Sequence, residues 1–110
     1  MSEGKQTTIN GDYVKILSKA AEEGLTACLI FLGREMGAVR ICMIDGHIRQ
    51  IDSTWGVGRK ELYRVLEWKK GLCRIKSLTE REVEDLKEKN IVMTAGELII
   101  LLDRYGNSSN

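Results

Sequence analysis

The Asp45-Gly46 dipeptide constrains the fold of this chain most strongly, because it separates two runs of strand-like sequence. Apolar residues alternate with other residues in AVRICMI (38–44), and HIRQIDS (47–53) follows the dipeptide. Asp-Gly between two such runs is a strong hairpin signal, since both central residues of a type I′ turn need a positive φ. The sequence therefore predicts a tight antiparallel hairpin with Asp45 and Gly46 at its turn.

Two further segments extend this hairpin into a sheet. LTACLIFLG (25–33) is short, apolar and bounded by glycine, which favours a strand buried on both faces. It completes a three-stranded antiparallel meander with the hairpin. LCRIKS (72–77) alternates apolar and charged residues, which predicts a fourth, half-exposed strand.

Helical spacing predicts four helices around this sheet. The first covers about residues 11–23 and stops at Gly24. A central helix follows the glycine-containing loop at Gly58. Its apolar stripe contains Leu62, Val65, Leu66 and Lys69, with Tyr63 beside it, and Gly71 is expected at its carboxyl cap.

Capping boxes mark the starts of the last two helices. Thr79 with Glu82 opens TEREVEDLKEKN, and Thr94 with Glu97 opens TAGELIILLDRY. The first is expected on the surface, since Val83 and Leu86 are its apolar anchors, and the second is expected to pack deeply. The predicted class is α+β: an antiparallel meander sheet of about four strands with an N-terminal helix, a central helix and two C-terminal helices.

Length and composition are those of one globular domain. The chain has 110 residues, of which 43% are hydrophobic and 30% are charged, and its net charge is +1. We expect a single domain over 1–110, with an ordered core at about 11–105 and flexible ends at 1–10 and 106–110. No run of about 18 apolar residues and no secretory signal are present, so a cytoplasmic location without membrane contact is predicted.

The chemistry-bearing residues do not form a recognisable reactive centre. His47 follows the turn and is expected to be an exposed strand histidine. Three cysteines (Cys28, Cys42 and Cys73) without a C-x-x-C pattern are expected to be reduced. Cys28 and Cys42 would lie near each other across the first hairpin if the register allowed it, but their interpretation as small buried hydrophobes is favoured. The Gly56-Val57-Gly58 stretch lacks the third glycine and the parallel βαβ setting of a dinucleotide site. We therefore expect no enzymatic activity, no cofactor and no metal.

Trp55 stands out because it lies in a polar, glycine-flanked loop. Such a tryptophan either folds back onto the sheet or is available to a partner, whereas Trp68 at a helix end is expected in the core. Tryptophan and arginine dominate binding energy at many interfaces. The candidate interaction residues are Trp55, Arg59, Lys60 and Arg64.

The same region is rich in basic residues, which leaves a second interpretation open. These residues are Arg59, Lys60, Arg64, Lys69, Lys70, Arg74 and Lys76. Contacts to a phosphate backbone need them on one face. The near-neutral net charge favours a solvated face over a nucleic-acid site.

The pattern from the hairpin to the C-terminal helix resembles the PATAN domain, the amino-terminal domain of the cyanobacterial regulator PatA. The matching residues are Gly37, Val39, Ile41, Asp45-Gly46, Ile48, Gly58, Glu61-Leu62-Tyr63, Leu66, Trp68, Gly71, Ile75, Thr94, Glu97-Leu98-Ile99-Ile100 and Arg104. The resemblance covers about residues 11–105. The chain departs from the family pattern at Ile51-Asp52 and at Cys73, which stands at a usual aromatic position.

This resemblance implies a non-enzymatic module of bacterial signalling that acts through protein contacts. Receiver-domain or small-GTPase-type signalling proteins are the partners that it implies. The first hypothesis is therefore a cytoplasmic protein-interaction or adaptor domain, in which a homodimer would bury a sheet edge. The alternatives are nucleic-acid binding through the Arg59–Lys76 basic residues and a small-ligand or thiol-based sensor.

Overall fold

A five-stranded antiparallel sheet is the centre of the computed structural model, which describes residues 6–107. The sheet order is β1-β5-β2-β3-β4, so the last strand in sequence lies between the first two. The strands are β1 (Gln6–Asp12), β2 (Ala27–Leu32), β3 (Ala38–Ile44), β4 (His47–Ser53) and β5 (Lys70–Ser77). The helices are α1 (Tyr13–Glu23), α2 (Leu62–Trp68), α3 (Glu80–Lys87) and α4 (Ala95–Asn107), with single 3₁₀ turns η1 (Arg34–Met36) and η2 (Arg59–Glu61).

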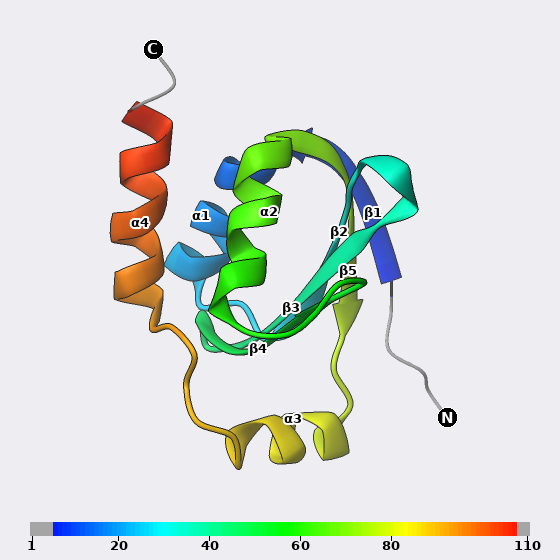
Figure 1. Ribbon diagram of the computed structural model, residues 1–110. Helices are drawn as coiled ribbons and strands as arrows, with labels where there is room; N and C mark the ends of the chain where they lie inside the picture. The colour runs from blue at the N-terminus through cyan, green and yellow to red at the C-terminus, as the bar shows by residue number, and fades with distance from the viewer. Residues whose placement is uncertain (1–5, 108–110) are drawn as a thin grey trace.

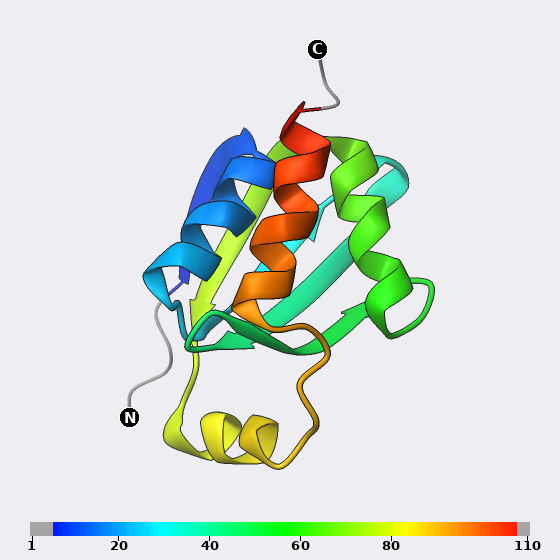
Figure 2. The same cartoon turned by 90° about the vertical axis from the view of Figure 1, so that its left-hand side faces the viewer.

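Three helices cover one face of the sheet, and the fourth lies at its end (Figures 1 and 2). The main core lies beneath α1, α2 and α4 and includes Tyr13, Phe31 and Leu98, each without exposed surface. On the opposite face, α3 packs Leu86 against a small cluster at one end of the sheet. The rest of that face carries mainly polar residues such as Arg40, Asp52 and Arg74, together with the exposed Leu72. The α+β class and the four helices are confirmed.

The predicted hairpin is confirmed in its details. Asp45 and Gly46 have φ values of 54° and 83°, as the type I′ turn requires. The Gly46 amide donates to the Leu25 carbonyl (2.9 Å), and the Asp45 amide donates to the Thr26 hydroxyl (3.0 Å). The turn is therefore bonded to the start of β2, and β2, β3 and β4 form the expected meander.

The start of the chain differs from the sequence-based expectation. Residues 6–10, expected to be flexible, belong to β1, which pairs with β5 over its whole length. At the other end, α4 continues to Asn107, past the predicted limit at residue 105. The remaining expectations of flexibility, for residues 1–5 and 108–110, lie outside the described residues.

The end of α2 also differs. Lys69, expected on the helical stripe, is the exposed residue that ends the helix, with φ 72°. Gly71, expected at the carboxyl cap, lies inside β5. Its role is steric, because a Cβ there would lie 2.5 Å from the Tyr13 hydroxyl oxygen. That hydroxyl bonds the carbonyls of Leu32 (2.6 Å) and Leu72 (2.8 Å), and so joins α1 to two strands.

The other predicted helix signals are present. Leu62, Val65 and Leu66 are buried, and Trp68 packs against the core. The capping boxes form as expected: Thr79 and Glu82 bond each other's amides, and so do Thr94 and Glu97. Within the described residues, no helix has the length and apolar character needed to cross a membrane.

Candidate functional site

The loop after β4 forms a surface together with residues of η1 and α2. We call it the Trp55 surface, and it consists of Met36, Trp55, Val57, Arg64 and Trp68. The loop folds because the Ser53 hydroxyl accepts hydrogen bonds from the amides of Trp55 (2.9 Å) and Gly56 (3.1 Å). The Ser53 amide in turn donates to the Gly56 carbonyl (2.7 Å). A serine at the strand end thereby reverses the chain and presents Trp55 at the edge of the sheet.

A buried carboxylate supports this loop from below. Glu61 is 2% exposed and receives hydrogen bonds from the Ser53 hydroxyl (2.6 Å) and the Arg64 Nε (2.7 Å). The Ser53 hydrogen bond, with smaller contributions from Arg64 and Lys60, holds the pKa of Glu61 below its usual value despite the opposing effect of burial. Glu61 is therefore an ionised structural support.

Trp55 is fixed between neighbours while half of its ring stays in solvent. The guanidinium carbon of Arg64 lies 4.4 Å from the centre of the Trp55 ring, a cation–π arrangement. The Trp55 and Trp68 ring centres are 6.2 Å apart. The Trp55 ring occupies the space where Gly37 would carry a side chain. Trp55 is 45% exposed, which resolves its alternatives: the ring lies against the domain and remains accessible.

Exposed apolar residues flank this tryptophan. Met36, which adjoins Gly37, is 97% exposed, and Val57 is 70% exposed. Val57 is two residues from Trp55 in the chain, and Met36 adjoins Gly37, whose Cβ position the Trp55 ring occupies. The Trp55 surface thus combines an anchored aromatic ring, an arginine and two exposed apolar side chains.

The four predicted interaction residues do not all lie free on this surface. Arg64 is in contact with Trp55, but its Nε is paired with Glu61. Arg59 points toward the C-terminal segment, where its Nη2 donates to the Val92 carbonyl (2.8 Å). Lys60 is exposed on η2. Gly58 has φ 106° and only lets the chain turn into η2, as expected.

His47 was expected to be an exposed strand histidine, but it is half-buried against the start of α4. Its Nδ1 accepts a hydrogen bond from the Ala95 amide (2.9 Å) at the start of α4. Among the described residues, no carboxylate or thiol is hydrogen-bonded to this imidazole. The same part of the chain holds no group of three potential metal ligands.

The cysteines differ most from the expectation of reduced thiols. Cys28 and Cys42 form a disulfide across β2 and β3, with Cα atoms 4.0 Å apart. They are direct partners in the register of the two strands, so the proximity that the sequence left to the register is present, whereas the expected reduced state is wrong. Cys73 is buried, and burial raises the pKa of its thiol to about 12, so it stays protonated at neutral pH.

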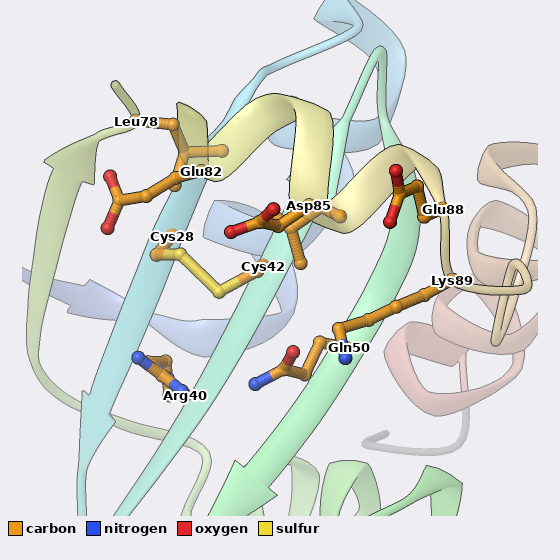
Figure 3. Close-up of a pocket in the computed structure, with 10 residues that line it drawn as sticks. Cys28, Arg40, Cys42, Gln50, Leu78, Glu82, Asp85, Glu88 and Lys89 are labelled. Atoms are coloured by element: carbon orange, nitrogen blue, oxygen red, sulfur yellow. A yellow bond between two sulfur atoms is a disulfide. The ribbon is translucent and has the colours of Figure 1, made fainter. Parts of the chain in front are cut away.

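The disulfide forms part of an open pocket of 590 Å³ between α3 and the sheet (Figure 3). Glu82 and Asp85 come from α3, Glu88 is the residue that follows its last turn, and Arg40 lies on the sheet beyond the disulfide (Figure 3). The hydrogen bond from the Thr79 amide, followed by the Thr79 hydroxyl and nearby cations, lowers the pKa of Glu82. Within this lining both cysteines are joined in the disulfide, and Glu82 bonds the Thr79 amide as part of the helix cap.

Comparisons with family models, curated proteins and solved structures found no match for this chain. The resemblance to the PATAN domain therefore depends on the sequence pattern alone.

Proposed function

We propose that this chain is a non-enzymatic protein-interaction or adaptor domain of bacterial signalling, and that the Trp55 surface binds its partner. The observation that carries the proposal is the half-exposed Trp55 ring, held in place by Arg64 and Gly37. A ring fixed before binding loses little conformational entropy when a partner covers it. Tryptophan, arginine and methionine are enriched where interfaces bury their central residues.

The experiment compares two residues of equal exposure on different surfaces. Trp55→Ala removes the ring, whereas Leu72→Ala changes a side chain on β5 that is 44% exposed, against 45% for Trp55. Proteins cross-linked to the wild-type domain in a cell extract are quantified by mass spectrometry and again with each variant. Loss of a partner by at least about tenfold with Trp55→Ala and its retention with Leu72→Ala support the proposal.

Thermal unfolding of both variants shows whether each remains folded. A folded Trp55→Ala protein that retains every wild-type partner overturns the proposed surface. Following the resemblance, we propose receiver-domain or small-GTPase-type signalling proteins as the partner class. The identity of the cross-linked proteins tests this part separately.

The proposed location is the cytoplasm, again from the resemblance. Structural disulfides are uncommon there. The oxidation state of Cys28 and Cys42 in protein taken from cells with thiols blocked at lysis therefore tests the location. Reduced cysteines agree with it, and a fully formed disulfide speaks against it.

One observation favours the nucleic-acid alternative. The exposed face of the sheet carries a row of basic residues on β5, namely Lys70, Arg74 and Lys76. Their side chains point away from the face on which Cys73 is buried, because side chains alternate along a strand. Arg59 and Arg64 are held by other partners, so the alternative depends chiefly on this row, with Lys60 and Lys69 exposed outside it. Salt-dependent binding of a generic DNA or RNA, lost on Arg74→Ala with Lys76→Ala, would support it. Absence of binding at low salt removes it.

A further inference from the structure

The two edges of the sheet are unlike each other. The β4 edge is covered at both ends, because Ile48 forms a bridge with Met93 and Asp52 forms one with Val57. The Ile48 amide donates to the Met93 carbonyl, and the Val92 amide donates to the Ile48 carbonyl, each at 2.8 Å. Within residues 6–107, β1 pairs with β5 on one side and with no strand on the other. Figure 2 shows β1 at the margin of the sheet, beside α1.

The hydrogen-bond pattern shows which groups of β1 face the open side. The Tyr13 amide donates to the Lys69 carbonyl (2.8 Å). Tyr13 and Lys69 are the next pair after Asp12 and Lys70, so this bond continues the β1–β5 register. In an antiparallel ladder, alternate residues bond the same neighbour. Ile9 and every second residue from it therefore bond β5, whereas the amides and carbonyls of Thr8 and Asn10 point away from the sheet.

The sequence of β1 lacks the features that protect sheet edges. QTTINGD contains no proline and no lysine, and its register with β5 is continuous over seven residue pairs. Its one charged residue, Asp12, is at the end of the strand. Such an edge can accept another strand through main-chain hydrogen bonds.

We propose that β1 is the self-association surface: two copies of the chain pair β1 with β1, antiparallel about a twofold axis at Ile9. In this register Thr8 lies opposite Asn10 of the second copy, and both have their hydrogen-bonding groups directed outward. Asp12 lies opposite Gln6 of the second copy, so like charges do not meet. The two five-stranded sheets then become one continuous sheet.

Apolar surface selects this register among the twofold alternatives. Ile9 is 37% exposed on the helix side of β1 and lines an open groove of 280 Å³ with Ile16, Leu29 and Ile75. Directly opposed residues of a non-hydrogen-bonded pair have close Cβ atoms. The Ile9 side chains of the two copies therefore contact each other and cover part of both grooves. A register shifted by two residues places Thr7 or Gly11 opposite Ile9 and loses this contact.

The inference goes beyond the proposed function, because it uses the opposite edge of the sheet. The Trp55 surface follows β4, and its loop bonds to the start of β3. Both Trp55 surfaces remain exposed in such a dimer. A failure of the partner experiment and a failure of this one are therefore independent.

The test begins with residue-resolved hydrogen exchange on the wild-type chain at low and high concentration. The Thr8 and Asn10 amides should exchange more slowly at high concentration, while the Ile9 amide, already bonded to β5, should not change. Equilibrium sedimentation over the same range should shift from the 12.4 kDa chain to twice that mass. Sedimentation of monomer alone, or a dimer without protection of Thr8 and Asn10, overturns the proposal.

Two variants test the residues directly. Thr8→Pro removes an outward amide without removing a bond to β5, and should weaken dimerisation by at least about tenfold. The control is Leu72→Lys. Leu72 is an apolar residue of β5 on the other face of the sheet, 44% exposed against 37% for Ile9, and its replacement should leave the dimer intact. A folded Thr8→Pro protein that dimerises as well as wild type contradicts the inference. Should Thr8→Pro not fold, the exchange pattern of the wild-type chain decides alone.

Discussion

Replacing Glu61 by alanine should destabilise the domain by about 2 kcal/mol, because the carboxylate is the buried support of the Trp55 loop. It has two charge-assisted hydrogen bonds, from the Ser53 hydroxyl at 2.6 Å and from the Arg64 Nε at 2.7 Å. Each such bond contributes about 1.5–3 kcal/mol when both groups are buried. The sum of the two contributions is an upper bound, because Ser53 and Arg64 each find another hydrogen-bonding partner when the carboxylate is removed.

Two features of the site reduce that bound. The Arg64 side chain is 43% exposed and regains water when the carboxylate is removed, so its pairing is worth about 0.5 kcal/mol. The Ser53 hydroxyl has a second acceptor, the Gly56 carbonyl at 3.3 Å, which keeps the loss near the lower end of the range. For a domain of this size, about 2 kcal/mol corresponds to a fall of roughly 8 °C in Tm.

Urea unfolding monitored by tryptophan fluorescence measures this loss directly. The matched control is Glu67→Ala, which removes an exposed carboxylate from α2, the helix that follows Glu61, and should change the unfolding free energy by less than about 0.5 kcal/mol. A Glu61→Ala protein as stable as that control would refute the reasoning. It would mean that Ser53 and Arg64 hold the loop without the carboxylate.

Three further predictions concern the same domain. Because the pKa of Glu61 is lowered on folding, the stability it provides is complete above about pH 4.5 and is lost as pH falls through its folded pKa; the difference in unfolding free energy between wild type and Glu61→Gln should therefore shrink from pH 7 to pH 3. Gly37→Ala should displace the Trp55 ring, shift its fluorescence to longer wavelength and cost about 1–3 kcal/mol, whereas Gly56→Ala, whose Cβ meets atoms no closer than 3.7 Å, should preserve the spectrum. Changing both bridged cysteines to alanine should lower the oxidised protein's stability by about 3 kcal/mol, as expected for a loop of this length, and make it insensitive to a dithiol reductant; an unchanged unfolding midpoint in oxidising buffer would contradict this.

Local chemistry explains what could be predicted of the fold. Asp45-Gly46 specifies its turn by backbone φ alone, and Thr79 with Glu82 caps a helix through contacts three residues apart. These signals depend on neighbours in sequence, so they are readable without the tertiary structure. The central helix was predictable in the same way from the spacing of Leu62, Val65 and Leu66.

Features that depend on distant residues were not predictable. β1 has no apolar alternation, and its strand conformation comes from pairing with β5, for example Ile9 with Cys73. Gly71 resembles a helix cap in sequence, but its position is required by the hydroxyl of Tyr13. A disulfide between the first two cysteines needs the β2–β3 register, which the apolar run of residues 25–33 does not specify.

In the candidate site, too, local sequence signals were readable and contacts between separated residues were not. The polar, glycine-flanked setting of Trp55 predicted an accessible ring, which the structure shows at 45% exposure, and its role in binding stays a prediction. The burial of Glu61 was not visible, because a glutamate next to two basic residues at the start of a helix is ordinarily solvated. The hydroxyl of Ser53, eight residues earlier, is what makes an ionised buried carboxylate tolerable there.

The position of β5 has a consequence for how the chain folds during synthesis. β5 separates β1 from β2, so neither strand has its main-chain partner on that side until Ser77 has left the ribosome. Only the β2–β4 meander can assemble earlier, from contacts close in sequence. A nascent chain stalled before residue 70 would therefore leave β1 unpaired and one edge of β2 open, and exposed strand edges of this kind favour aggregation during synthesis.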